Sequence, residues 1–184
     1  MPQDVRTTFL MHQPPKYWTP GPADDVMIDR HVLLLAFIFI RAAASAAEPA
    51  APDQRLTPGA IRDIDPAVVC APGYARAHRA WHDKASTLIK YGLPPSQARD
   101  FEDDDRVPIC VGGDNTDPGN HWPQRCTEWK DVRCVAGPAF EKDRLEAWAC
   151  RAVCDEHQMP LAAAQHMFLG DWRAAYREVF GRAP

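Results

Sequence analysis

The feature that most constrains the fold of this 184-residue chain is the stretch at 101–124. Two short strand-like segments, at 101–102 and 107–111, flank a run of three aspartates and an arginine. A glycine pair at 112–113 then opens a loop rich in turn-forming residues, and this loop ends at Asn120. The order predicts a strand, a turn, a second strand and a glycine loop closed by an asparagine.

Helical patterns surround this stretch. Residues 75–91 have helical composition, and Pro138 suits the first position of a second helix that runs to about 154. From 160 to 181, apolar residues recur at the helical spacing of i, i+3, i+4 and i+7. We therefore predict the α+β fold class, with one domain at 67–181.

The N-terminal third is predicted to lie outside that domain. Residues 27–47 resemble a signal peptide, because an apolar run of nine residues precedes a stretch of small residues. The run is shorter than the roughly 20 residues that span a bilayer, although a short buried helix or a membrane anchor stays as an alternative. Residues 1–26 are interpreted as an over-extended N-terminus, and 48–66 as a flexible, extended leader. The expected location is periplasmic or secreted, with no stable membrane insertion after cleavage.

The cysteines support an oxidising compartment. An even number of cysteines behind a signal peptide predicts three disulfides, whose connectivity stays open. Two of them lie one helical turn apart on the predicted second helix, where each is expected to pair with a different partner. A structural zinc site is the alternative, but only this one pair has the short spacing that zinc sites favour. The six residues are Cys70, Cys110, Cys126, Cys134, Cys150 and Cys154.

The charge balance limits the function classes. The net charge of −4, from 21 basic and 25 acidic residues, disfavours a protein that binds nucleic acid mainly by electrostatic attraction. It leaves a nuclease open, because a bound metal ion changes the local field.

Residues 68–180 resemble small secreted HNH-endonuclease-like proteins of bacteria. In that family the hairpin has the order Tyr-Glu-x-Asp-His-x-x-Pro-Leu-x-x-Gly-Gly, and an asparagine follows it. The resemblance covers most of the predicted domain and implies a small ββα-metal finger embedded in helices and stapled by disulfides. The matching segments are 69–76, 91–94, 101–104, 107–113, 120–124, 142–146, 164–165 and 171–172.

The resemblance assigns roles to four residues. Asp104 matches a metal ligand, and Asp105 stands where the family has its general-base histidine. Together these carboxylates are candidate ligands for a divalent ion such as Mg²⁺, which prefers oxygen. Asp105 is a weak base near neutral pH, because free aspartate has a pKa of about 3.9. Asn120 is the expected loop anchor, and His121, at a position more often held by leucine, is a second catalytic candidate.

Further candidates lie beside these. Lys142 and Arg106 are predicted phosphate contacts, although Lys142 can equally form an i, i+4 pair with Glu146. Glu141 and Asp143 are candidates for a third metal ligand on the helix. The resulting hypothesis is an HNH-like, metal-dependent nuclease that acts on DNA or RNA. The alternative is a catalytically inactive HNH-fold secreted protein with a binding or structural role.

Overall fold

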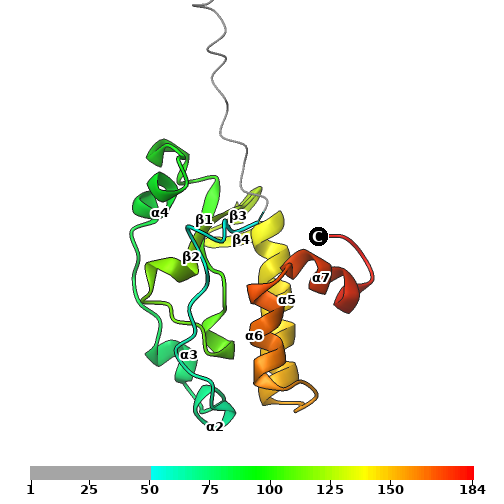
Figure 1. Ribbon diagram of the computed structural model, residues 1–184. Helices are drawn as coiled ribbons and strands as arrows, with labels where there is room; N and C mark the ends of the chain where they lie inside the picture. The colour runs from blue at the N-terminus through cyan, green and yellow to red at the C-terminus, as the bar shows by residue number, and fades with distance from the viewer. Residues whose placement is uncertain (1–50) are drawn as a thin grey trace, which may run out of the picture. The chain divides into compact units, whose positions relative to one another are not determined.

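The computed structural model describes residues 51–184. The segments predicted at 1–26 and 27–47 lie outside the described residues. No helix in the described part is long and apolar enough to cross a membrane. The described chain is a mixed α/β domain with two small antiparallel sheets, each of two strands (Figure 1).

Three short helices form the first part of the domain. They are α2 (Pro66–Val69), α3 (Tyr74–Ala77) and α4 (Lys84–Lys90). The prediction of one continuous helix over 75–91 is therefore wrong. Asp83 explains the break, because its side chain accepts a hydrogen bond from the Ala85 amide and caps a new helix.

The first sheet pairs β1 (Phe101–Asp105) with β2 (His121–Arg125). The predicted second strand at 107–111 is wrong, because this segment contains the 3₁₀ helix η2 (Ile109–Val111) instead. Pro108 directly before η2 has no amide hydrogen to give to a strand ladder. The strand partner of β1 thus comes from beyond the glycine loop, after a second 3₁₀ helix, η3 (Pro118–Asn120).

The glycine pair after η2 is required by the backbone. Gly112 has a φ of 86°, in the left-handed region that favours glycine. A Cβ atom on Gly113 would lie 1.8 Å from the carbonyl oxygen of Val107, a distance that no side chain tolerates. These two positions let the chain fold back onto the end of β1.

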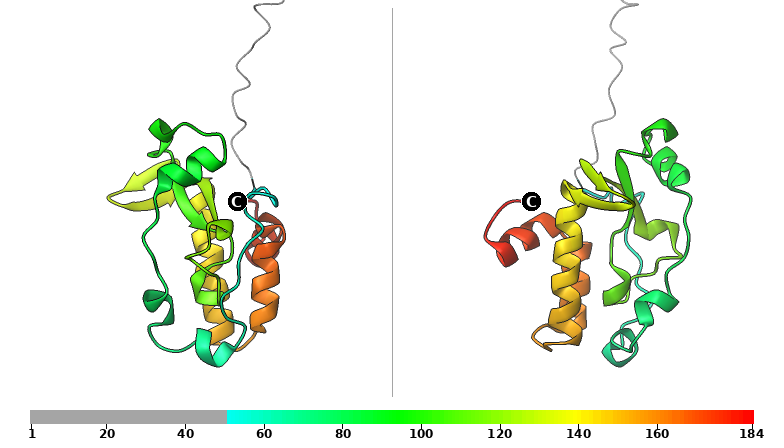
Figure 2. Two further views of the ribbon diagram at one scale, coloured as in Figure 1. Left: turned by 60° about the vertical axis from the view of Figure 1, so that its left-hand side comes forward. Right: turned by 180° about the vertical axis from the view of Figure 1, so that it is seen from behind.

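The chain after β2 forms a second hairpin. Its strands are β3 (Glu128–Lys130) and β4 (Arg133–Ala136), and it projects from the edge of the domain in the left view of Figure 2. Asp131 takes a positive φ of 56° between the strands, a conformation that aspartate tolerates better than most residues. The other 3₁₀ segment, η1 (Pro95–Gln97), lies between α4 and β1.

The C-terminal helices are α5 (Pro138–Cys154), α6 (Leu161–Leu169) and α7 (Trp172–Phe180). The predicted helix at 138–154 is confirmed, whereas the one at 160–181 is two helices, because Asp171 caps α7 through the Arg173 amide. Along the chain, α5 follows β4 and contacts both β1 and β2. The main core joins α5, α6 and α7 to η2 through Val107, Ile109, Val111, Leu145, Ala149, Phe168, Trp172 and Tyr176.

All six cysteines form disulfides, as predicted. The pairs are Cys70–Cys154, Cys110–Cys150 and Cys126–Cys134. The two cysteines on α5 pair with different partners, which confirms the expectation from their helical spacing. The first two disulfides therefore tie α5 to the end of α2 and to η2, and the zinc alternative is excluded.

The leader at 48–66 is extended, but its described part is held firmly. The Thr57 side chain is fully buried and donates to the His121 carbonyl at 2.8 Å. Ile61 forms an isolated β-bridge with Gly113, and Gln165 donates to the Asp63 carbonyl at 2.9 Å. The described part of the leader is therefore attached to the domain at Thr57, Ile61 and Asp63.

The disulfides are predicted to differ in their contribution to stability. The Cys70–Cys154 bond has a sequence separation of 84, against 8 for Cys126–Cys134. A longer loop loses more chain entropy when it is closed in the unfolded state, so we expect losses of about 4–5 kcal/mol and about 2–3 kcal/mol, respectively. Urea unfolding of the two Cys→Ser double variants measures this difference. Equal losses would contradict the expectation that Cys70–Cys154, which closes the longer loop, contributes more to stability.

Candidate functional site

Asn120 fixes the geometry at the end of the hairpin. Its fully buried side chain accepts from the Val107 amide and donates to the Val107 carbonyl, both at 2.9 Å. The Asn120 carbonyl accepts from the Arg106 amide at 2.6 Å. These bonds tie the start of β2 to the residues that follow β1, which is the anchoring role predicted for Asn120.

The acidic residues of β1 divide between two faces of the strand. Successive side chains of a strand point to opposite faces, so Asp103 and Asp105 share one face while Asp104 lies on the other. In the ladder, Asp105 is opposite His121 and Asp104 is opposite Trp122. The structure therefore separates the predicted metal ligands Asp104 and Asp105 and brings the catalytic candidates Asp105 and His121 together.

On the face toward α5, a lysine forms an ion pair with the Asp104 carboxylate. The Lys142 ammonium nitrogen lies 3.1 Å from Asp104 Oδ2 and donates to the Asp105 carbonyl at 2.5 Å. It also pairs with Glu146 one helical turn away. Lys142 is fully buried, so the prediction of a phosphate contact is wrong. The residue instead joins α5 to β1.

The other predicted phosphate contact is also buried. Arg106 is 1% exposed, and its guanidinium donates to the carbonyl of Thr57 at 2.6 Å. Two further donations go to the carbonyls of Phe168 and Leu169 at the end of α6. The positive charge thus satisfies carbonyl groups at a helix C-terminus, and the predicted phosphate contact is wrong for Arg106 too.

Several carboxyl groups surround the single Lys142 ammonium. Burial and the neighbouring Asp104 and Asp143 raise the pKa of Glu102 to about 7. Burial and Asp104 raise the pKa of Asp143 to about 6. Burial also raises the pKa of Asp104, and Lys142 partly offsets that shift. Lys142, with Lys84 beside Glu102 and Arg79 beside Asp143, acts against these shifts, but burial outweighs them for both carboxyl groups.

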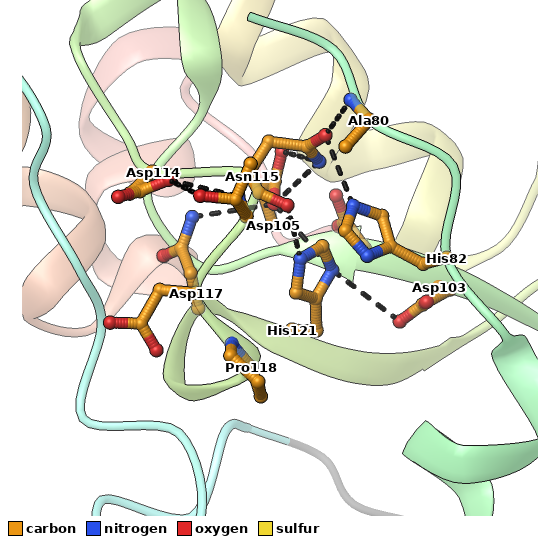
Figure 3. Close-up of polar contacts among 12 residues, drawn as sticks. Ala80, His82, Asp103, Asp105, Asp114, Asn115, Asp117, Pro118 and His121 are labelled. Atoms are coloured by element: carbon orange, nitrogen blue, oxygen red, sulfur yellow. Dashed lines mark hydrogen bonds and ion pairs between the residues drawn. The ribbon is translucent and has the colours of Figure 1, made fainter.

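On the opposite face, His121 points one ring nitrogen at two carboxylates (Figure 3). The residue is 3% exposed, and its Nε2 lies 2.8 Å from the Asn115 carbonyl. A carbonyl only accepts, so Nε2 carries the hydrogen. The Nδ1 atom lies 3.7 Å from Asp103 Oδ1 and 3.7 Å from Asp105 Oδ1, and has no hydrogen-bond partner among the described residues.

The two carboxylates beside His121 have different partners. Both oxygens of Asp105 accept from the Asn115 amide nitrogen, at 3.1 and 3.0 Å. Burial raises the pKa of Asp105, and the charge of His121 acts against that shift. Neither oxygen of Asp103 has a hydrogen-bond partner in the described part of the chain, although its side chain is only 9% exposed. Burying a charged carboxylate without a hydrogen-bond partner lowers the stability of the fold unless a cation compensates its charge.

A hollow of about 170 Å³ lies beside His121. The His82 ring packs on the His121 ring with centroids 3.8 Å apart, and His82 Nε2 lies 3.1 Å from Asn115 Oδ1. The Lys90 ammonium donates to the His121 carbonyl at 2.6 Å. The lining residues are His82, Asp83, Ser86, Thr87, Lys90, Thr116, Pro118 and His121.

The two faces differ in how well they fit a divalent ion. An ion at Asp104 would have to displace the Lys142 ammonium, so that face does not fit. Of the candidates for a third metal ligand, Glu141 accepts hydrogen bonds from Arg144 and Tyr176 instead. Asp143 lies on the Lys142 face.

The other face offers one imidazole nitrogen and two carboxylates. His121 Nδ1 and Asp105 Oδ1 lie 3.7 Å apart, close enough for both to be donors to one ion. No group of three His, Cys, Asp or Glu side chains within 51–184 is already arranged to hold a metal. Binding at His121 therefore requires Asp103 and Asp105 to turn toward the ion.

Three residues of this face were missed from the sequence. Asp103 could have been found, because it lies two residues before Asp105 on a strand and so shares its face. Asn115 and His82 come from a loop and from the break between α3 and α4. No local pattern indicates that either residue reaches His121.

The chain matches no family model, and no similar curated protein or solved structure is found. The HNH-like resemblance therefore depends on the motif residues themselves, and the function has to be inferred from the site.

The raised pKa of Glu102 leads to a prediction about pH. The group binds its proton more tightly in the folded chain, so its contribution to stability is lost as pH rises from about 4.5 to about 7. Glu102→Gln stays neutral, and we expect it to exceed the parent at pH 8 by about 1–3 kcal/mol in unfolding free energy. The gain should vanish below pH 5. Urea unfolding across pH checks this, with the exposed Glu128→Gln as the control.

Proposed function

We propose that this chain is an HNH-like, metal-dependent phosphodiesterase that cleaves nucleic acid. The observation that carries the proposal is the cross-strand pair of Asp105 and His121. Where the family pattern has Asp-His along β1, this chain has an aspartate on β1 and a histidine opposite it on β2. The imidazole is thus kept on the same face of the hairpin but is supplied by the other strand.

The surrounding fold supports this interpretation. After β2 the chain forms the β3–β4 hairpin and then α5, and both β1 and β2 contact that helix, as the two strands of a ββα finger contact theirs. Asn120 closes the hairpin through the backbone of Val107. The three disulfides suit an oxidising compartment, so we place the protein in the periplasm or outside the cell.

In this proposal, Asp103, Asp105 and His121 hold the divalent ion, and Asp104 does not. A bound ion would polarise a phosphate oxygen and make a coordinated water more acidic. A site with an imidazole ligand favours Mn²⁺ or Zn²⁺ over Mg²⁺, which prefers oxygen ligands. The expected cofactor therefore changes from Mg²⁺ to a transition-metal ion.

Neighbouring residues position this ligand set. Asn115 holds both oxygens of Asp105 with its side chain and fixes the His121 tautomer with its carbonyl, so that Nδ1 faces the carboxylates. His82 covers one face of the His121 ring. Lys90 is bound by the carbonyls of Pro118 and His121, and its charge would attract a phosphate to the hollow.

A second candidate function follows from the Lys142–Asp104 contact. The carboxylate expected to bind metal is neutralised by a buried lysine. If the opposite face binds no ion either, the chain is a catalytically inactive HNH-like fold with a binding role. The experiments below separate the two candidates.

Cleavage is the direct test of the proposal. We expect the oxidised protein to cut DNA or RNA with Mn²⁺ or Zn²⁺ and to stop when chelator is added. Asp105→Asn and His121→Ala should lower the rate about 100-fold or more, because each removes a ligand of an ion worth several kcal/mol of transition-state stabilisation. The exposed His166→Gln on α6 is the matched control and should cut like the parent. Cleavage that survives both site variants would refute the assignment.

Ion binding can be measured without cleavage. Titration calorimetry with Mn²⁺ should give about one site, which disappears in Asp103→Asn and His121→Ala. Asp104→Asn should keep the site, because Asp104 is paired with Lys142 on the other face. Circular dichroism confirms that each variant is folded. Loss of binding in Asp104→Asn alone would place the ion beside α5 instead, and no binding to the parent would favour the inactive fold.

A further inference from the structure

Trp81 is the largest exposed apolar side chain in the described part of the chain, with 86% of its surface accessible. It lies in the segment at 78–83 between α3 and α4. A soluble domain does not gain stability from an aromatic ring that contacts so little of the protein. The ring is therefore available to a partner.

The residues on both sides of Trp81 contact the candidate site, Ala80 through its backbone amide and His82 through its side chain (Figure 3). The Ala80 amide donates to Asn115 Oδ1 at 2.6 Å. His82 contacts the same oxygen and packs on His121. Trp81 is thus held next to Asp105 and His121 by its two neighbours in the chain, while its own ring remains outside. This position suits a substrate contact more than a structural role.

The charge of the surrounding segment indicates the chemistry of the partner. Residues 74–91 carry four basic side chains and one acidic side chain, whereas the whole chain has 21 basic and 25 acidic residues. The four are Arg76, Arg79, Lys84 and Lys90. The ammonium groups of Lys84 and Lys90 donate to backbone carbonyls of the domain. In the sequence, the segment that carries the exposed ring is therefore basic in an otherwise acidic chain, which favours a polyanion as its partner.

We propose that Trp81 is a stacking platform for an unpaired nucleobase, and that the substrate is single-stranded nucleic acid. This inference builds on the proposed function and specifies its substrate class. Bases of a single strand expose their faces to aromatic side chains, whereas those of a duplex are stacked on one another. A base on Trp81 would bring the adjoining phosphates toward Lys90 and the hollow beside His121.

The test is a binding measurement that does not depend on cleavage. Anisotropy of a fluorescein-labelled oligodeoxythymidine is followed with the oxidised full chain in chelator. Trp81→Ala should weaken binding about 5- to 150-fold, the range for loss of one stacked base. Val132→Ala, which removes an apolar side chain that is 89% exposed on the β3–β4 hairpin, is the matched control and should bind like the parent. Binding to a duplex of the same length should not change in Trp81→Ala.

A conservative variant separates stacking from a general loss of structure. Trp81→Phe keeps an aromatic face and should retain binding within about threefold, far from the loss expected for Trp81→Ala. Its intrinsic fluorescence, however, should lose the quenching that the oligonucleotide causes in the parent. Trp122 and Trp172 are buried and should contribute little to that quenching.

The outcomes are distinct from those of the cleavage assay. Equal affinity of the parent and Trp81→Ala, or no binding by the parent, would overturn the stacking proposal even if the protein cuts. Trp81-dependent binding without any cutting would support the platform and refute the catalytic proposal. A dimer that dissociates in Trp81→Ala, seen by sedimentation, would assign the ring to a second copy of the chain and overturn the nucleobase.

Discussion

The hydrogen bonds between the Asn120 side chain and the Val107 backbone control the geometry on which the site depends. They hold the first residues after β1 against the residue that precedes β2. The ladder register then follows, and Asp105 comes to lie opposite His121. A shift of this register by one residue would move His121 to the other face of the sheet. One buried amide therefore determines which side chains meet.

Both faces of β1 bury carboxylates, and burying a carboxylate lowers stability unless another charge compensates it. The two faces differ in where the compensating charge comes from. On the side of α5 the compensation is internal, because Lys142 contacts Asp104 and Glu146, and protons on the remaining groups lower the charge. Opposite, Asp103 has no hydrogen-bond partner among the described residues, and His121 Nδ1 faces it. In the proposed function, an external cation would supply the missing charge there.

The sequence predicted local and covalent features better than long-range contacts. The helix at 138–154 followed from a proline start and apolar periodicity, and the separate partners of Cys150 and Cys154 followed from their helical spacing. The strand predicted at 107–111 is wrong. Pro108 and the glycine pair that follows η2 cause a tight turn there, which the apolar composition of the segment does not indicate. Spacing along the chain likewise did not show that Lys142 and Arg106 are buried, because their partners are distant in sequence.

Under the proposed function, the position of His121 is an example of a motif that changes while its chemistry is retained. A linear motif records which residues follow one another, whereas a site depends on which residues share a face. Residues directly opposite in an antiparallel pair have Cβ atoms about 5 Å apart, so exchanging the two side chains moves each by about one side-chain length. Replacing the histidine on β1 by an aspartate therefore removes the imidazole from this face only if β2 carries no histidine opposite it. Here β2 offers His121, and the imidazole stays beside the Asp105 carboxylate.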